Sequence, residues 1–336
     1  MTKTIGIIGL GSIFPHQLCA LSRISNLLKL TAICDLSEEK LETGKKLAIK
    51  SLCCKNLAIY SSPRQFFENS NCETIMVATP PHTHYSLVKM SLETGHNTIV
   101  EKPAVLHLDE FDELRRLAKE KKLFFQVAYH AAYAPDLIWF ANHRVEIEER
   151  YSLGELQLIE CGFYDPYIID GCLIDDKGLL GGSYLDSTVN ELSVCNILIP
   201  LEKYSTKTFS ERKMGIPSVT CCSSLVLENL EDSRMPIIRC KTDWTLGLNE
   251  KTTTLLYSHG KVFLDHSKQT VSVICDKDDI HLFDNGNEPR LPTHYKNLFV
   301  DYIGRYEHLK DNQNESVVIH RILLSNFSGC QYSANP

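Results

Sequence analysis

The segment TIGIIGLGSI, which runs from Thr4 to Ile13, decides the fold. Its first half is a short apolar run that ends at Gly9, which is typical of a strand buried on both faces. Apolar residues at helical spacing follow over residues 16–28, so the chain turns from a strand directly into a helix. Glycines at such a turn allow the backbone to approach a pyrophosphate at the helix N-terminus. Phe14 takes the place of the third glycine of the complete motif, so a dinucleotide site also needs support from the surrounding sequence.

Asp35 provides that support, because it follows the next predicted strand, Leu30–Cys34. A carboxylate in this position can accept hydrogen bonds from both hydroxyls of an adenosine ribose, and it repels a 2′-phosphate. The pattern therefore predicts NAD as the cofactor and favours it over NADP. The alternative is structural: the glycines would serve only the turn, and Asp35 would cap the helix that follows. Ser37 is another candidate for the N-cap of that helix.

Strands and helices alternate through the first third of the chain. Further predicted strands are Ile59-Tyr60, Thr74–Ala78, Thr98–Val100 and Leu123–Val127, and the predicted helices cover residues 37–46, Arg64–Asn69, Tyr85–Thr94 and Asp109–Lys121. Parallel neighbours need crossover helices, so this alternation predicts an α/β fold with a doubly wound parallel sheet, the Rossmann architecture. We expect a dinucleotide-binding domain over residues 1–127.

The pattern changes after residue 127. The predicted strands are Leu156–Phe163, Val219–Leu227, Ile237–Trp244, Thr252–Ser258, Val262–His266 and Thr270–Cys275, with helices at Tyr184–Leu198 and Ser316–Ser325. His259-Gly260 between two of these strands is a strong hairpin signal. Successive strands with short turns predict an antiparallel sheet in a second, α+β domain over residues 128–336. Of the elements of this domain, the C-terminal helix is the candidate for packing against the first domain.

Composition excludes several classes of protein. The chain has 336 residues, of which 43% are hydrophobic and 23% charged, as in a two-domain globular protein. A net charge of −7 gives little basis for binding nucleic acid or an anionic membrane, and no apolar run is long enough for a membrane span. The first strand begins directly after the N-terminus, so we expect no signal peptide and a cytoplasmic location. The 13 cysteines include no Cys-x-x-Cys pair, so neither a zinc ribbon nor a redox dithiol is visible. Their odd number, without a secretion signal, indicates reduced thiols.

Two loops follow predicted strands at the sheet edge where open parallel sheets bind ligands. Thr79-Pro80-Pro81-His82-Thr83-His84 follows the fourth strand, and its histidines lack acidic or cysteine neighbours, so we expect no metal site. Glu101-Lys102-Pro103 closes the fifth strand. A lysine beside a cofactor can hydrogen-bond a reacting hydroxyl and stabilise the developing oxyanion, while the proline fixes the backbone. The alternative is an ordinary surface turn.

These motifs, together with Val77-Ala78 and Gly95-His96, resemble the glucose–fructose oxidoreductase/inositol dehydrogenase (Gfo/Idh/MocA) family over the first domain. The resemblance implies an oxidoreductase with a sugar substrate. It also implies a second domain with a large, mostly antiparallel open sheet, through which members commonly form homo-oligomers, here a dimer or a tetramer. The cofactor contacts expected on this basis are Gly9, Gly11, Ser12, Ile13, Asp35, Thr79, Pro80, His84, Glu101 and Lys102.

The segment from Gly181 to Asn190 looks like the second catalytic motif of this family. Ser183 is the predicted N-cap, which places Asp186 and Asn190 four residues apart on one helix face. Many members carry a histidine where this chain has Asn190. Because an amide cannot titrate, Asp186 is the predicted general base, with Lys102 coupled to it. The structural alternative makes Asp186 a partner of the helix dipole and Asn190 a hydrogen-bonding core residue.

The Asp-x-x-x-Asn pair is similar to the branch of D-galactose 1-dehydrogenase and L-arabinose 1-dehydrogenase, which oxidises free sugars at the anomeric carbon. The segment from Val127 to Pro135 is similar to that branch's Trp-His-x-Arg-Tyr-Ala-Pro, with Ala132 in place of the arginine. The stretch Tyr164–Asp170, which should line the sugar pocket, lacks the branch's tryptophan. The substrate contacts implied are Lys102, His130, Asp186, Asn190 and Trp244, with a packing role left open for His130 and Trp244.

The predicted function is therefore that of an NAD(P)-dependent dehydrogenase that oxidises an aldose, at C1, to the lactone. One alternative is an oxidoreductase acting at another carbon of a polyol or nucleotide sugar. Another is a non-catalytic regulatory protein of the same fold that binds a dinucleotide or a sugar. The presence of Lys102, Asp186 and Asn190 together favours catalysis, because a binding protein does not need all three.

Overall fold

The computed structural model describes residues 2–52, 56–169, 172–173, 180–215, 218–275, 278–307 and 311–327. The adjacent Cys53-Cys54 pair and Asp170, the last residue of the predicted pocket stretch, lie outside them. The chain forms two compact units. The first consists of Met1–His130 and Leu291–Val317, and the second of Ala131–Arg290 and Val318–Pro336.

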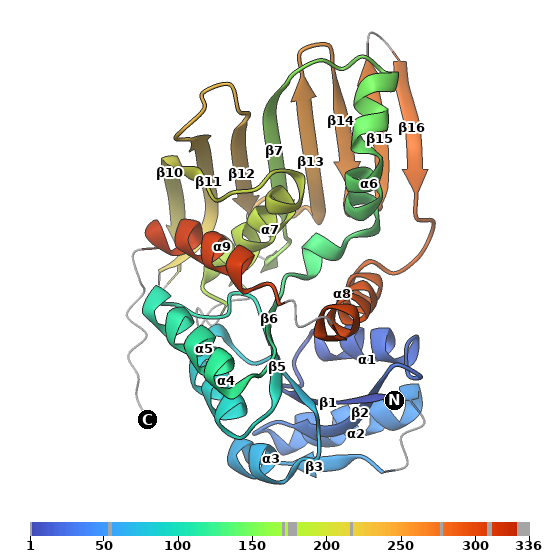
Figure 1. Ribbon diagram of the computed structural model, residues 1–336, viewed down its shortest axis with the longest axis vertical. Helices are drawn as coiled ribbons and strands as arrows, with labels where there is room; N and C mark the ends of the chain where they lie inside the picture. The colour runs from blue at the N-terminus through green and yellow to red at the C-terminus, as the bar shows by residue number, and fades with distance from the viewer. Residues whose placement is uncertain are drawn as a thin grey trace. The chain divides into compact units, whose positions relative to one another are not determined.

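A parallel sheet with the strand order β3-β2-β1-β4-β5-β6 forms the centre of the first unit (Figure 1). Within the described residues its strands are β1 (Lys3–Ile8), β2 (Leu28–Cys34), β3 (Ala58–Tyr60), β4 (Thr74–Val77), β5 (Asn97–Glu101) and β6 (Phe125–Ala128). Every residue of β4, β5 and β6 is buried, as both faces of the sheet are covered. This order is that of a doubly wound Rossmann sheet, and it confirms the predicted fold class.

Helices connect these strands at the predicted places. They are α1 (Phe14–Ser22), α2 (Glu38–Leu52), α3 (Pro63–Asn69), η1 (Pro81–Thr83), α4 (His84–Glu93) and α5 (Leu108–Lys121), with η2 (His130–Tyr133) after β6. Ser37 caps α2, since its Oγ accepts a hydrogen bond from the Lys40 amide at 3.3 Å. Gly95 ends α4 with a φ of +91°, the left-handed conformation that a glycine adopts without strain.

A helix far along the chain, α8 (Arg290–Glu307), completes the first unit and was not predicted. The Tyr302 hydroxyl lies 2.5 Å from Thr74 Oγ1 on β4, and its ring packs edge-on against Phe124. Helix α9 (Gln313–Ser325), which confirms the predicted C-terminal helix, begins in the first unit and ends in the second. The Asn312 side chain before it bonds both the N–H and the C=O of Val127.

The second unit contains a large sheet with the order β10-β11-β12-β7-β13-β14-β15-β16. Its described strands are β7 (Leu156–Tyr164), β10 (Tyr204–Met214), β11 (Val219–Asn229), β12 (Ile237–Asp243), β13 (Glu250–Tyr257), β14 (Gly260–Asp265), β15 (Thr270–Cys275) and β16 (Asp278–Asp284), and a separate pair joins β8 (Ile168–Ile169) to β9 (Cys172–Leu173). Neighbours are antiparallel except β12 and β7. The mostly antiparallel sheet and the predicted hairpin are confirmed, with the turn at Ser258-His259 because Gly260 already pairs with Tyr257. Strands β10 and β16 were not predicted.

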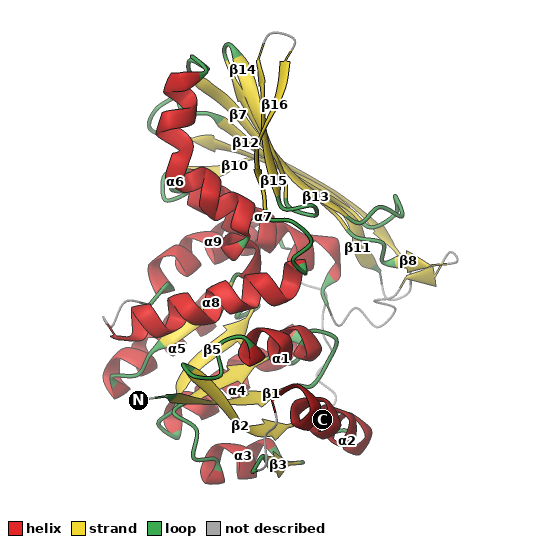
Figure 2. Ribbon diagram, turned by 90° about the vertical axis from the view of Figure 1, so that its right-hand side faces the viewer, coloured by secondary structure: helices red, strands yellow, loops and turns green. Residues whose placement is uncertain are grey.

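Helices cover one face of this sheet. Figure 2 shows α6 (Pro135–Arg150), which was not predicted, and α7 (Val189–Leu198) on the same side of it. On β13 the side chains of Thr253, Leu255 and Tyr257 are buried, whereas Leu256 is 39% exposed. The alternation with period two places one face of the strand in the core and leaves the other partly open to solvent.

Candidate functional site

The glycine turn after β1 has the geometry that a dinucleotide needs. Gly9 has a φ of +95°, and a Cβ atom added there would lie 2.3 Å from the Ala78 carbonyl oxygen, so no other residue fits. A Cβ atom added at Gly11 would meet no atom within 4 Å, so open space lies in front of this residue at the start of α1. Ser12 is exposed and Ile13 half-buried beside it. An open cradle at a helix N-terminus fits a pyrophosphate.

The position of Asp35 is compatible both with a structural role at the turn and with binding of ribose hydroxyls. Its Oδ2 accepts a hydrogen bond from the Leu10 amide at 2.8 Å and its Oδ1 one from the Ser37 amide at 2.9 Å. These bonds fix the glycine turn to the end of β2 and shape the start of α2. Each carboxylate oxygen can accept a second hydrogen bond, so the group can also take ribose hydroxyls.

Two alanine substitutions separate the fold of this turn from its function. Gly9→Ala is expected to lower the free energy of unfolding by about 3 kcal/mol, because the methyl group collides with backbone and the positive φ adds strain. Gly11→Ala is expected to keep wild-type stability and to weaken NAD(P)H binding by about 10-fold or more, because its methyl group enters the open cradle. Chemical denaturation and calorimetric titration measure the two effects. Undiminished affinity in the folded Gly11→Ala variant would remove the cradle assignment.

His84 ties together the two loops at the edge of the sheet. It is fully buried, with Nε2 at 2.6 Å from the Thr79 carbonyl oxygen and Nδ1 at 2.8 Å from that of Pro103. Burial lowers the pKa of His84 to about 4, while the contacts with the two carbonyl oxygens oppose the shift. The buried ring thus holds the loop that starts at Thr79 against the residue that follows Lys102. Pro80, in contrast, is exposed.

Glu101 fixes the end of β5. Its Oε1 accepts hydrogen bonds from Gln17 Nε2 on α1 at 3.2 Å and from the Tyr295 hydroxyl on α8 at 2.6 Å, two partners that the sequence did not reveal. Burial raises the pKa of Glu101 to about 7, although Tyr295 and Lys102 oppose the shift. Half-buried Lys102 follows directly, joined to Pro103 by a cis peptide bond. Both neighbours of Lys102 in the chain are therefore anchored.

The pKa of Glu101 predicts a pH-dependent difference between the wild type and Glu101→Gln. A carboxyl group with a raised pKa contributes stability that is fully present below about pH 4.5 and is lost as the pH rises through 7. Glutamine keeps an acceptor for Gln17 and Tyr295 but cannot ionise. We expect the variant to gain about 3 kcal/mol in the free energy of unfolding, relative to the wild type, between pH 4.5 and pH 8. Urea denaturation at both pH values measures it, and a constant difference between the two proteins would contradict it.

His130 is the last residue of the first segment of the first unit, and its ring packs among other rings of that unit. Its ring centroid is 5.6 Å from that of Tyr295 and 5.9 Å from that of His294, and the residue is 8% exposed. These ring contacts support the packing role that the sequence left open for His130. Tyr295 connects it to Glu101, and through Glu101 to the strand that carries Lys102.

The helix that carries Asp186 starts earlier than predicted. Ser183 directly precedes the π-helical turn but does not cap it with its side chain: its dihedrals are already helical (φ −57°, ψ −32°), and its hydroxyl makes no capping bond. Gly181 and Gly182, with φ of +79° and +78°, form the turn that precedes the helix. A Cβ atom on Gly182 would lie 2.5 Å from the Thr220 carbonyl oxygen, so close packing against β11 sets the start. The first turns are π-helical over Tyr184–Thr188 (η3), an irregularity frequent at functional sites.

Asp186 and Asn190 lie next to each other on this helix, in the order predicted. Asn190 Nδ2 donates to the backbone carbonyl oxygen of Asp186 at 3.2 Å. The Asn190 side chain is buried, and among the described residues none forms a hydrogen bond with its Oδ1. Asp186 is half-buried. A buried acceptor that makes no hydrogen bond costs stability. Asn190 Oδ1 is therefore a candidate acceptor for a hydroxyl group of a ligand.

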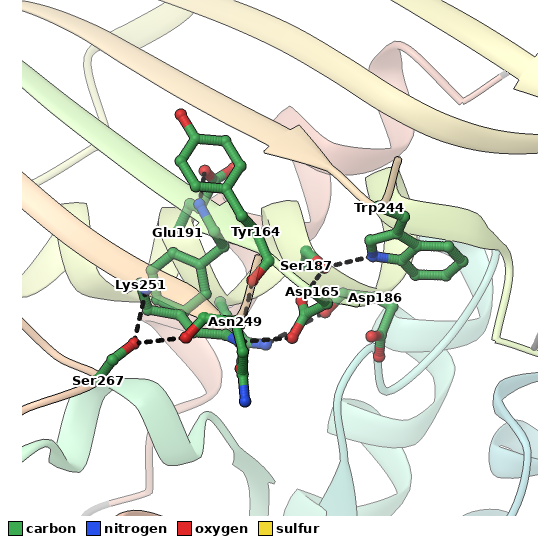
Figure 3. Close-up of polar contacts among 11 residues, drawn as sticks. Tyr164, Asp165, Asp186, Ser187, Glu191, Trp244, Asn249, Lys251 and Ser267 are labelled. Carbon is green, nitrogen blue, oxygen red and sulfur yellow. Dashed lines mark hydrogen bonds and ion pairs between the residues drawn. The ribbon is translucent and has the colours of Figure 1, made fainter. Parts of the chain in front are cut away.

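A buried charged pair that the sequence analysis did not identify stands beside Asp186 (Figure 3). Lys251 lies on β13, and Asp165 is the residue after the end of β7. Lys251 Nζ is 2.7 Å from Asp165 Oδ1, and Asp165 Oδ2 accepts a hydrogen bond from Ser187 Oγ at 2.9 Å. Burial lowers the pKa of Lys251, while attraction to Asp165 and Asp186 opposes the shift. The strand pattern contained a signal for Lys251, since it shares the buried face with Thr253.

Trp244 belongs to the core of the second unit. It is fully buried, its indole N–H donates to Ser187 Oγ at 3.2 Å, and its ring packs edge-on against Tyr167 at 4.7 Å between centroids. A buried ring offers no face to a sugar, so the packing role that the sequence left open fits this geometry.

Glu191 is a second carboxyl group that sequence reasoning missed. It is fully buried on α7, and its Oε1 accepts hydrogen bonds from the amides of Phe163 on β7 at 3.2 Å and Lys241 on β12 at 2.9 Å. Burial raises its pKa well above the usual value. The group thereby joins α7, which also carries Asn190, to two strands of the sheet. Within the described residues there is no cluster of three or more potential metal ligands.

Comparisons with known proteins agree with this geometry. Residues 3–129 match the GFO_IDH_MocA family model, described as an oxidoreductase family with an NAD-binding Rossmann fold. The chain is 26% identical over 204 residues to an uncharacterized oxidoreductase of Schizosaccharomyces pombe, an alignment that covers 58% of this chain and 53% of that protein. It is 27% identical over 137 residues to inositol 2-dehydrogenase/D-chiro-inositol 3-dehydrogenase of Lactiplantibacillus plantarum, covering 40% and 37%.

The chain thus spans about half or less of the length of these two curated relatives. Its fold matches over a longer range. KijD10, a 3-ketoreductase from Actinomadura kijaniata in complex with NADP and TDP-benzene, superimposes with a TM-score of 0.80 at 14% identity over 97% of this chain and 96% of that one. Residues 3–129 form an NAD-binding Rossmann fold, and 97% of this chain shares the fold of KijD10. In the part of the chain described, no helix is long and apolar enough to cross a membrane.

Proposed function

We propose that this protein is an NAD(P)-dependent oxidoreductase of the Gfo/Idh/MocA family that acts on a CH–OH group of a sugar. The family match of residues 3–129 supports the cofactor class. The observation that carries the catalytic part is the Asp186–Asn190 pair on one helix: Asn190 Nδ2 donates to the backbone carbonyl oxygen of Asp186, and among the described residues none forms a hydrogen bond with the buried Asn190 Oδ1.

The cofactor would be held by the first unit. Gly9, Gly11, Ser12 and Ile13 form the turn for the pyrophosphate, and the carboxylate of Asp35 accepts ribose hydroxyls, which favours NAD. Thr79, Pro80, His84 and Glu101 belong to the adjoining loops, where buried His84 and Glu101 act by fixing the backbone around Lys102. When bound, the nicotinamide supplies the acceptor or donor of the hydride.

The reacting hydroxyl would be handled by three side chains. Asp186 accepts its proton, and Asn190 Oδ1 holds the sugar in place through a hydrogen bond from a hydroxyl. Lys102 donates a hydrogen bond to the reacting oxygen and stabilises its negative charge as the proton leaves. In this mechanism Lys102 and Asp186 act on the same oxygen atom. His130 and Trp244 have only packing roles.

The finer proposal is oxidation of an aldose at C1 to the lactone, as the similarity of the Asp-x-x-x-Asn pair to D-galactose and L-arabinose 1-dehydrogenases implies. A specific observation favours a second candidate, reaction at another carbon of a polyol or nucleotide sugar. The curated relative named for inositol acts at positions 2 and 3, and KijD10 is named a 3-ketoreductase. We further propose a cytoplasmic homo-oligomer, formed through the partly exposed face of the large sheet.

The test is a panel of aldoses, polyols and nucleotide sugars, each with NAD and NADP, followed by the change in nicotinamide absorbance. We expect turnover with an aldose and a lactone as the product by mass spectrometry. Turnover with a product oxidised elsewhere selects the second candidate. Tight NAD(P)H binding without turnover of any compound selects a non-catalytic binding protein and overturns the proposal.

A further inference from the structure

Asp165 and Lys251 form a charged pair that is almost entirely enclosed within the second unit. Their side chains are 16% and 4% exposed, and the two charged atoms lie 2.7 Å apart. Lys251 lies on β13 and Asp165 directly follows the neighbouring strand β7, at the end nearest the helix that carries Asp186 (Figure 3). Withdrawing two charges from water costs about as much as their attraction returns, so such a pair seldom increases stability over an apolar pair. Its position points to a different role.

Lys251 does not present its charge to a substrate. Besides Asp165, the ammonium group donates to the backbone carbonyl oxygen of Tyr164 at 3.1 Å and to Oδ1 of Asn249. An ammonium group has three protons, and these three acceptors use them all. Lys251 is therefore a positioning residue and not a catalytic one.

The second oxygen of Asp165 extends the connection to the π-helical turn. It accepts the hydrogen bond of Ser187 Oγ, and Ser187 Oγ in turn accepts the indole N–H of Trp244. Ser187 lies inside η3, next to Asp186 in the chain. Turns with hydrogen bonds from residue i to i+5 are rare. Here the hydrogen bonds of Ser187 with Asp165 and Trp244 support such a turn.

We infer that Lys251 and Asp165 hold the π-helical turn through Ser187 and thereby determine the direction of the Asp186 carboxylate. The catalytic part of this inference rests on the proposed function. The physical part, the support of the turn, does not depend on any substrate.

Three variants interrupt the connection at different points. Lys251→Met leaves the Asp165 carboxylate buried without its partner, and Asp165→Asn does the same to the ammonium group. Ser187→Ala removes the contact at the turn and uncovers no buried charge, so it should fold in any case. The double variant Lys251→Met/Asp165→Asn replaces both charges by neutral groups of similar shape. Lys268→Met, which removes an exposed ammonium group that pairs with Asp265 in the same unit, is the matched control.

Hydrogen–deuterium exchange of the full-length proteins tests the support of the turn without a substrate. We expect the amides of Tyr184–Thr188 to exchange about 10-fold faster or more in the three single variants, because the turn opens more often. The same amides should exchange at the wild-type rate in Lys268→Met. Wild-type exchange in Ser187→Ala and in the other folded variants overturns the inference, whether or not the enzyme's sugar is known.

Kinetics with a sugar that the wild type turns over test the effect on Asp186. We expect kcat to fall about 10²-fold in Lys251→Met, with the KM for the cofactor unchanged, because a small displacement of a reacting group costs about that much. The double variant should lose no more than the worse single variant, since both changes break one connection. Wild-type kcat in the single variants contradicts the positioning role. If the wild type turns over no sugar, the proposed function fails, while the exchange experiment still decides whether the turn is supported.

Discussion

Lys102→Met is expected to lower kcat by about 10³-fold or more while NAD(P)H binding remains measurable. Methionine has a similar length but neither charge nor proton, so the reacting oxygen would lose the hydrogen bond that stabilises its negative charge. Other side chains make the hydrogen bonds that anchor the neighbours of Lys102: Glu101 accepts from Gln17 and Tyr295, and His84 faces the carbonyl oxygen of Pro103. The loop should therefore keep its shape in the variant.

Initial rates and calorimetric titration with NADH measure the two halves of this prediction. Lys119→Met, which removes an exposed ammonium group from the last turn of α5 in the same unit, is the matched control and should have wild-type kcat. Turnover at the wild-type rate in Lys102→Met would remove the proposed mechanism. Loss of NADH binding together with turnover would instead give Lys102 a role in holding the cofactor.

Asp186→Asn is the second large effect that we expect, with a fall in kcat of about 10³-fold. An amide has the shape of the carboxyl group but cannot take a proton from the sugar hydroxyl. Because Asn190 bonds the backbone of residue 186 and not its side chain, the helix should be undisturbed. Asp284→Asn, at the end of the edge strand β16, makes the same chemical change at an exposed position and should leave kcat unchanged.

Rates at saturating sugar and cofactor, together with the melting temperature, test this second prediction. A wild-type rate in Asp186→Asn would leave Lys102 as the sole proton acceptor. A lowered melting temperature with an unchanged rate would give Asp186 the structural role considered for it, that of a partner of the helix dipole.

Some parts of the site were visible in the sequence only as one of two alternatives. Trp244 had equal claims as a sugar platform and as a core residue, and its burial against Tyr167 favours the core. The predicted capping role of Ser183 was wrong because its backbone is already helical, after a turn in which the backbone of β11 approaches Gly182 closely. Whether a side chain is buried, or a backbone approached closely, depends on a distant segment of the chain. The local sequence does not specify which segment packs there.

The sequence alone determined what neighbouring residues control through backbone geometry and periodicity. The glycine turn before Asp35, the alternating strands and helices of the first unit and the hairpin at His259-Gly260 all depend on residues a few positions apart. Only the tertiary structure decided the partners of the buried charges: Glu101 with Tyr295 of a helix that was not predicted, and Lys251 with Asp165 and, through it, Ser187. A buried charge is stable only where distant segments bring it hydrogen bonds and an opposite charge, and packing in three dimensions selects those segments.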